Sequence, residues 1–525
     1  MSIVRYFALT PVFLVLAISV NAQLPPAAQK ALDAGIASAK AGDFPAAIKS
    51  LDEARKIAPD SPAVYFNLGL AESKIPGREL RAVCALEAYL ALSPNAENAA
   101  AVRSAINGLE ATSRNNIDKL IAVLKTGFAN LSGQPRYGRQ PEVSLPVLFL
   151  KYGQPEAAEA TIKAIKGRDS YSTRPDDARF ALLKTFCTMN RLDDAVKQAD
   201  LITDGSVKGN ANGELAKGYI AAGRFREAKS VFEMFNRPDM DLLLEMAVAE
   251  YKAGMTDDAE ARFQDARNAS ISESKRAELP WWAVRDIPDL AYARWRMGQK
   301  DAAEILLKQT LTDADGLSGK SPNAAKVMVI LSLSSTLEQM GRHAEALKIM
   351  DKAEKYWQNE KRDKEEGVGI TSESYKIYNQ YKWLKEWQRA EKFIVALGVT
   401  TVFENGMEGL KHWIAQYQGE IAVETARVAA TDAVNKSVAD GSATSAQRAT
   451  MWMQYSDSFM SAPIFTTDFN VMIKNLVDYT PPIDDSDKTR TVFARVEEPA
   501  EALIDALNNI HAMRERKAII TNWPL

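Results

Sequence analysis

Histidine is the first residue type to consider, because imidazole titrates near neutral pH and is the commonest metal ligand. The chain has three histidines, His343, His412 and His511, which are far apart in sequence. None lies in an H-E-x-x-H or other paired-ligand spacing, whereas zinc needs three or four converging ligands. We therefore expect no metal site. His343 directly follows a predicted turn, a position occupied elsewhere by Phe44, Leu192 and Phe225, so we expect it to pack.

The other short motifs give no catalytic pattern. The sequence has no G-x-S-x-G elbow and no Walker-type Gly-Lys-Ser/Thr loop. Asp484-Asp485-Ser486-Asp487 lacks the Gly and Glu of a calcium loop. The chain has 68 acidic residues, but no spacing selects an acid/base pair among them. We expect a protein that is not an enzyme and needs no cofactor; an enzyme with a site in the C-terminal helices is the less favoured alternative.

The two cysteines, Cys84 and Cys187, lie about 100 residues apart, in different units of the repeated pattern that is described in the next paragraph. Repeats of a stacked array touch only their neighbours, which disfavours a disulfide between them. We expect two buried thiols, because free cysteine commonly serves as a small core residue.

A repeated pattern indicates which elements build the fold. A Gly is followed five residues later by Ala and four residues after that by a large apolar residue. A recurrence every few tens of residues is typical of stacked repeats. The triplets are Gly42/Ala47/Leu51, Gly153/Ala158/Ile162, Gly223/Ala228/Phe232, Gly254/Ala259/Phe263, Gly298/Ala303/Leu307 and Gly341/Ala346/Met350.

One unit, residues 29 to 60, shows how the pattern would fold. An Ala-rich amphipathic stretch runs to Lys40, and Gly42 can adopt the left-handed conformation that ends a helix. In the next stretch Ala47, Leu51 and Ala54 share one helical face. Each unit is predicted to be a helix–turn–helix of about 34 residues, with an apolar face that only a neighbouring unit can cover.

These units resemble the tetratricopeptide repeat, whose signature runs W-x2-L-G-x2-Y, then Gly, Ala, Phe, Ala and Pro. The resemblance covers roughly residues 25 to 400. Asn190 replaces the turn Gly in one unit, and Trp387, Ala390 and Ile394 mark a last degenerate unit. The matching residues of the first units are Gly35, Gly42, Ala47, Leu51, Ala54, Pro59, Tyr65, Leu68 and Gly69. The resemblance implies an all-α solenoid, wound as a right-handed superhelix, with a C-terminal helical cap region.

The family resemblance also implies where a ligand would bind, since tetratricopeptide domains bind on positions 2, 5, 9, 12 and 13 of successive first helices. These columns give a candidate aromatic strip of Tyr251, Tyr292 and Trp295 with Arg296 beside it, which suits a peptide or a stacked sugar ring. The alternative is that Tyr and Trp at helical spacing belong to the core. The candidate ligand-binding residues are Tyr251, Lys252, Arg285, Tyr292, Trp295, Arg296 and Glu338; Ser335 and Gln339 fall in the same columns.

The N-terminus has the features of an export signal. Arg5 is followed by an apolar stretch from Tyr6 to Val20, and small residues precede a predicted cleavage after Ala22. No later segment has the apolar run of a membrane span. We expect a soluble periplasmic or extracellular protein; an uncleaved anchor is the alternative. The formal net charge of −3 argues against a nucleic-acid partner.

Domain boundaries follow from these signals. We expect a signal peptide at 1–22, an N-terminal repeat pair at 23–110, a linker or degenerate repeat at 111–145, and a repeat array at 146–400. Residues 401–525 form a helical region, either a cap or a separate helical domain. Within it we expect a long helix from Met407 to Val438 and a final helix from Lys488 to Ile519.

The function favoured by the sequence is a non-enzymatic scaffold of the bacterial cell envelope that holds a protein or peptide in its concave groove. A protein that binds glycan or envelope polymer through the aromatic strip is the first alternative.

Overall fold

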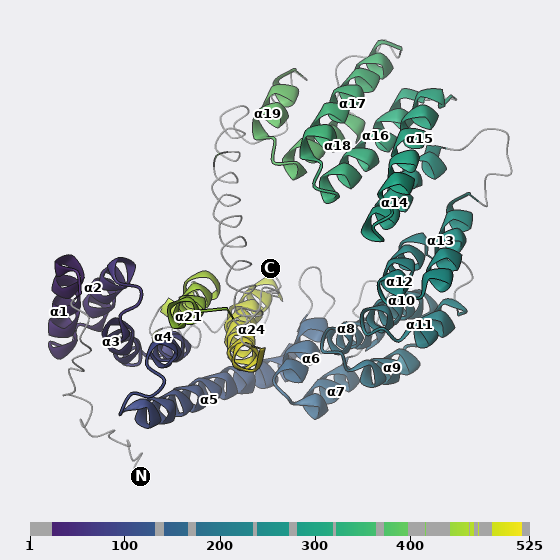
Figure 1. Cartoon of the computed structure of the whole chain (residues 1–525). Helices are drawn as coiled ribbons and strands as arrows, with labels where there is room; N and C mark the ends of the chain where they lie inside the picture. The colour runs from purple at the N-terminus through teal and green to yellow at the C-terminus, as the bar shows by residue number, and fades with distance from the viewer. Residues whose placement is uncertain are drawn as a thin grey trace. The chain divides into compact units, whose positions relative to one another are not determined.

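The computed structural model describes residues 24–131, 141–165, 175–234, 239–271, 281–318, 322–363, 372–396, 415, 442–460, 463–466, 471 and 486–516. Throughout these residues the regular structure is helical, as an all-α solenoid requires. Antiparallel helix pairs follow one another along the chain (Figure 1). The predicted signal peptide and the predicted helix from Met407 to Val438 lie outside the described residues, apart from Ala415.

The chain divides into two units. The terminal unit comprises residues 1–174 and 422–525, and the central unit comprises residues 175–421. This grouping differs from the predicted boundaries, because a break falls inside the expected array of 146–400 and the two ends of the chain share one unit. Each unit is described by itself below.

The terminal unit begins with three hairpins and one long helix. Its N-terminal helices are α1 (Pro26–Lys40), α2 (Phe44–Ile57), α3 (Pro62–Glu72), α4 (Glu79–Leu92), α5 (Ala99–Leu131), α6 (Pro141–Lys151) and α7 (Pro155–Ala164). Within the segment 111–145, predicted to be a linker or degenerate repeat, residues up to Leu131 continue α5.

The C-terminal helices of the terminal unit are α21 (Ser445–Phe459), α22 (Pro463–Thr466) and α24 (Ser486–Arg516). α21 packs mainly on α4, and α24 packs on α5 and α6. Two ion-pair groups fix α24: Lys151 on α6 pairs with Glu501 and Asp505, and Arg514 pairs with Glu87 and Glu110. The C-terminal helices therefore complete the unit that the N-terminal repeats begin.

Six hairpins make up the described part of the central unit. They are α8/α9 (Pro175–Thr188, Leu192–Leu201), α10/α11 (Gly205–Ala221, Phe225–Phe232), α12/α13 (Met240–Lys252, Thr256–Ile271), α14/α15 (Trp281–Arg296, Lys300–Gly316), α16/α17 (Pro322–Gln339, His343–Asp363) and α18/α19 (Ser372–Trp383, Trp387–Ala396). The first helix of one hairpin packs against the first helix of the next, from α8 to α18. The core is thus continuous along the stack, as expected for repeats that cannot bury their apolar faces alone.

The turn residues that the repeat pattern identifies have the conformation predicted from the sequence. Gly residues at the turns have positive φ, from 70° at Gly223 to 94° at Gly77. Asn190 also has positive φ, 56°, which confirms that it replaces the turn Gly. The last hairpin uses Lys385, φ 62°, a position that carries no turn signal in the sequence. Six hairpins also bury the Ala of the triplet almost completely: Ala47, Ala158, Ala228, Ala259, Ala303 and Ala346.

A second glycine of the pattern is needed for close packing within a hairpin. At Gly69 an added Cβ would lie 2.7 Å from the Leu86 side chain, so the two helices of the hairpin could not approach as closely. Both cysteines are free thiols. Cys84 is buried as predicted, whereas Cys187 is only partly buried.

Candidate binding surface

The candidate residues lie on the first helices of the central unit, on α12, α14 and α16. Contacts between neighbouring first helices show which side chains share this layer. Ser332 on α16 donates to the carbonyl oxygen of Arg285 on α14 at 2.9 Å. Ser335 on α16 lies 3.0 Å from the amide nitrogen of Gln380 on α18, which donates to it. We use the name first-helix face for the surface formed by the first helices of the central unit's hairpins, on which the candidate residues of α12, α14 and α16 lie.

Tyr292, Trp295 and Arg296 come together at the end of α14. The rings of Tyr292 and Trp295 are stacked, with centroids 6.0 Å apart and an interplanar angle of 14°. Both rings are partly buried and pack against the core formed by α14 to α19. The pair therefore has one side in the core and leaves part of its surface exposed. This arrangement lies between the two alternatives predicted from the sequence, a ligand-binding strip and a core position.

Arg296 connects this aromatic pair to the preceding hairpin. Its guanidinium lies 5.6 Å from the centre of the Tyr292 ring and makes two hydrogen bonds to the carboxylate of Glu245 on α12, one of them 3.0 Å long. The hydrogen bonds to Glu245 raise the pKa of Arg296. The Arg296 guanidinium thus contacts the Tyr292 ring and is also hydrogen-bonded to Glu245. These two contacts hold it beside the aromatic pair before any ligand binds.

Arg285 lies near the other end of α14. Its guanidinium is 5.5 Å from the ring of Trp281 and pairs with Asp286 at 3.1 Å. Tyr251 and Lys252 end α12, where Tyr251 is partly exposed and Lys252 is exposed. No hydrogen bond, ion pair or ring contact of the described residues joins Tyr251 or Lys252 to the aromatic pair.

Glu338 belongs to a different group of side chains, at the turn between α16 and α17. Its carboxylate lies 2.8 Å from Nδ1 of His343, and Nε2 of His343 lies 3.4 Å from Glu386 in the next hairpin. The hydrogen bond to Glu338 raises the pKa of His343. The expected packing role of His343 is therefore wrong: its side chain is 45% exposed and bridges two carboxylates of neighbouring repeats.

Acidic side chains of the same face were not identified from the sequence. Asp289 on α14 has its pKa raised to about 6, first by burial and then by the charges of Asp241 and Asp286. Asp241 likewise has a raised pKa, because of burial and the neighbouring carboxylates. The repeat spacing relates some polar residues of this face, because Glu245, Asp289 and Ser332 each lie nine residues before a turn Gly. This column is not among the ligand positions of the tetratricopeptide family, so the family resemblance did not select it.

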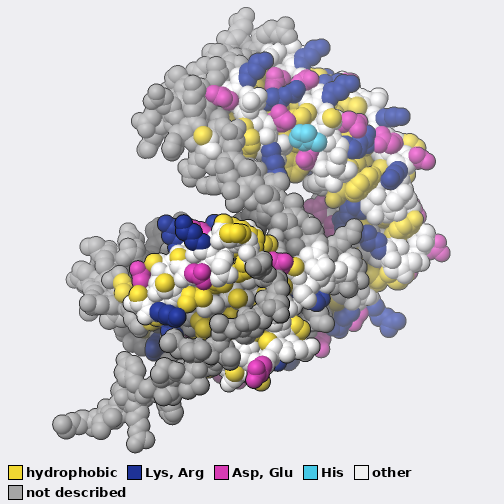
Figure 2. Space-filling view, turned by 60° about the vertical axis from the view of Figure 1, so that its left-hand side comes forward, with side chains coloured by type: hydrophobic (Ala, Val, Ile, Leu, Met, Phe, Trp, Pro, Cys, Tyr) yellow, Lys and Arg dark blue, Asp and Glu magenta, His cyan; other side chains and the backbone are white. Residues whose placement is uncertain are grey.

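The first-helix face thus combines aromatic rings, two fixed guanidinium groups and a surplus of carboxylates. Charges of both signs are also interspersed over the face of the molecule drawn in Figure 2. Among the described residues, no group of three or more His, Cys, Asp or Glu side chains has the arrangement of a metal site. None of the described helices combines the length and apolar character that crossing a membrane requires.

Comparison with known proteins gives no family assignment. No protein-family model matches the chain, and no curated protein matches it. One similar solved structure is described as Naa15/Naa10 bound to HypK-THB. It has 14% identity and a TM-score of 0.25, and the match covers 93% of this chain and 83% of that one. Another is a circular tandem repeat protein with 10% identity and a TM-score of 0.15, covering 93% of this chain and 97% of that one. At these scores neither similarity bears on function, so the fold assignment depends on the helix order and turn geometry described above.

Proposed function

We propose that this protein is an exported, non-enzymatic scaffold that binds a protein or peptide on the first-helix face of its central unit, and that its repeats are of the tetratricopeptide kind. The observation that carries this proposal is the partly exposed Tyr292–Trp295 stack, with Arg296 fixed beside it. Aromatic side chains and Arg are the residue types that most often dominate binding energy at protein interfaces.

Preorganisation supports binding at this place. The ion pair with Glu245 already orders Arg296, and core packing already orders the two rings. A ligand that contacts them therefore loses little side-chain entropy of the receptor, which is a large cost in most associations.

The charges favour a peptide that carries basic residues. Four carboxylates interact electrostatically on this face: Asp241, Glu245, Asp286 and Asp289. Burial, and after it the charges of neighbouring carboxylates, raise the pKa values of Asp241 and Asp289. Arg285 pairs with Asp286, and Arg296 pairs with Glu245. A Lys or Arg of the ligand would relieve the repulsion, so we expect a ligand with a basic residue next to an aromatic or aliphatic one.

A peptide library displayed on phage tests the proposal with the full chain. The wild type should enrich such a motif, and Tyr292→Ala combined with Trp295→Ala should weaken the enriched peptides about tenfold or more. Ile305→Ser is the matched control, because Ile305 is 66% exposed on a second helix, α15. Equal binding by the double variant would contradict the proposal. A change in Trp fluorescence with cell-wall glycan fragments, and none with peptides, would favour the glycan alternative.

Export is tested separately by sequencing the N-terminus of the protein isolated from its native cell. We expect the mature chain to begin at Gln23 and to be recovered outside the cytoplasm. A soluble cytoplasmic protein that retains Met1 would contradict export without affecting the binding proposal.

A further inference from the structure

Helix α4 is buried in a way that a second helix of a stacked repeat normally is not. In α2 the buried residues are confined to one face, at Ala47, Ile48, Leu51 and Ala54. In α4 they occur on all sides: Leu80, Arg81, Ala82, Val83, Cys84, Ala85, Leu86, Ala88, Tyr89 and Leu90. The additional cover is α21, whose buried residues include Ala449, Met451, Trp452, Met453 and Tyr455.

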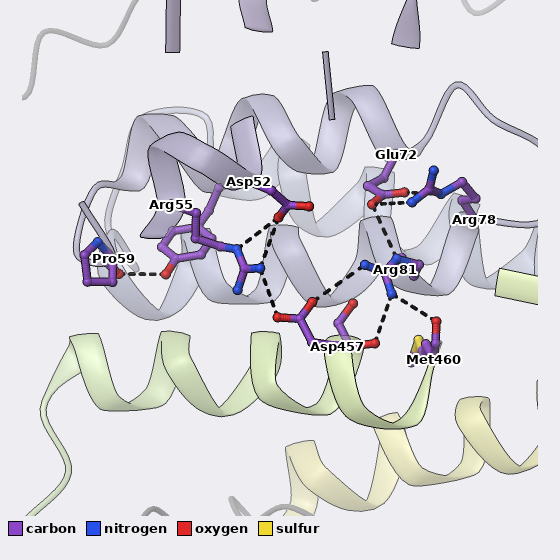
Figure 3. Close-up of polar contacts among 10 residues, drawn as sticks. Asp52, Arg55, Pro59, Glu72, Arg78, Arg81, Asp457 and Met460 are labelled. Atoms are coloured by element: carbon purple, nitrogen blue, oxygen red, sulfur yellow. Dashed lines mark hydrogen bonds and ion pairs between the residues drawn. The ribbon is translucent and has the colours of Figure 1, made fainter. Parts of the chain in front are cut away.

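The C-terminal end of α21 is held by side chains of the first repeats (Figure 3). Arg81 on α4 donates from Nη1 to two backbone carbonyl oxygens, those of Ser456 and Met460, at 3.0 Å each. The last carbonyls of a helix lack partners within the helix and carry the negative end of its dipole. The Ser456 carbonyl also accepts the backbone N–H of Met460 at 3.2 Å, so the guanidinium adds a second hydrogen bond there, and it complements the charge of the helix end.

An acidic side chain on α21 strengthens the same contact. Asp457 lies 2.9 Å from Arg55 on α2 and 3.7 Å from Arg81 on α4. One residue of the docked helix thus contacts both hairpins of the N-terminal pair. At the opposite end of α21, the side chains of Thr444 and Gln447 accept hydrogen bonds from backbone N–H groups and form a capping box within the helix itself.

Arg81 is itself oriented by a buried carboxylate. Glu72, which is 2% exposed, pairs with Arg81 at 3.4 Å and with Arg78 at 2.6 Å. Figure 3 shows Arg81 between Glu72 on one side and the end of α21 on the other. Desolvation offsets much of the attraction in a buried ion network, whereas removing one partner leaves an uncompensated buried charge.

We propose that the surface formed by α2 and α4 is a binding site for the C-terminal end of a helix, occupied by the chain's own α21, and that Arg81 selects the bound end. The ligand that fits is an amphipathic helix with free terminal carbonyls and an acidic residue in its last turn. In this arrangement the N-terminal repeats are a receptor for the C-terminal segment, and α21 excludes any other helix from that surface.

Hydrogen exchange measured by mass spectrometry on the full chain tests the role of Arg81. Arg81→Met should speed exchange of the amides of residues 445–459 about tenfold or more, because charge-assisted hydrogen bonds to the helix end are lost. Arg78→Met is the matched control, since Arg78 shares Glu72 but is not among the residues that contact α21 in Figure 3. If both variants loosen α21 equally, or neither does, the selecting role of Arg81 is excluded.

A peptide added in trans tests the site itself. In the full chain, Trp452→Asp should displace α21, and a labelled peptide of residues 442–460 with an amidated C-terminus should then bind to this variant and not to the wild type. Adding Arg81→Met to Trp452→Asp should weaken the peptide about tenfold, whereas adding Arg78→Met should not. Equal binding of a peptide with the reversed sequence would overturn the selection of the helix end. Should Trp452→Asp fail to fold, the exchange experiment still decides the proposal.

Discussion

The two units use the same helical hairpin for different purposes. In the terminal unit, the C-terminal helices cover α4 and α5, and the Glu72–Arg81 ion pair within the covered hairpin α3/α4 is buried. In the central unit, the ion pairs between hairpins are more exposed, with Glu245 51% exposed in its pair with Arg296. The comparison indicates that a hairpin surface becomes part of the core where helices from another part of the chain pack on it. A hairpin surface on which no described helix packs stays exposed to a partner.

The largest expected effect is the loss of the buried carboxylate in the terminal unit. Glu72→Ala leaves Arg78 and Arg81 without the charge they share, so the free energy of unfolding of this unit should fall by about 3–5 kcal/mol. Hydrogen exchange of α3 and α4 as a function of denaturant measures this change. Glu245→Ala in the central unit is the control, and should cost no more than about 1 kcal/mol. Similar losses in the two variants would remove the distinction between the units.

Glu250 is an exception that sharpens the comparison, because it is a buried acid within the central unit. It is 3% exposed, and burial raises its pKa to about 7. Since the folded pKa lies above the unfolded value of 4.5, the folded state holds the proton more tightly. Its contribution to stability is complete below about pH 4.5 and is lost as pH rises towards 7.

Replacing this acid should therefore stabilise the central unit at high pH. Glu250→Gln keeps the size of the side chain without its charge, and at pH 8 should raise the free energy of unfolding by about 1–3 kcal/mol. The gain should shrink towards pH 4.5. Denaturant unfolding followed by Trp fluorescence reports the difference between wild type and variant at each pH. A gain independent of pH would show that Glu250 does not titrate as described.

The smallest expected effect concerns the turns of the central unit. Lys385 has φ 62°, a conformation that strains an L-residue with a long side chain. Lys385→Gly should stabilise the last hairpin by about 0.5 kcal/mol, after allowing for the greater freedom of Gly in the unfolded chain. Asn190→Gly should change stability less, because Asn tolerates this conformation. The same unfolding measurement compares the two, and a loss of stability in the Lys385 variant would mean that its side chain makes a contact worth more than the strain.

The candidate surface could be predicted only in part from the sequence. The repeat columns correctly placed Tyr292, Trp295 and Arg296 next to one another, because residues three and four apart lie on one side of a helix. The same columns did not give Glu245 as the partner of Arg296, which comes from another hairpin 51 residues away. They also gave Glu338 as a candidate ligand-binding residue but did not indicate that its carboxylate pairs with His343 at a turn.

By itself, the sequence determined the helical hairpin and its turns. Local periodicity sets which residues face the neighbouring helix, and a residue with positive φ is needed wherever the turn closes, as at Gly42 and Asn190. Only the tertiary structure decided that the chain's two ends form one unit. Arg81 and Met460 are 379 residues apart, and no local pattern relates them. Their contact arises because the apolar faces of α4 and α21 bury each other and the charge on Arg81 matches the end of one particular helix.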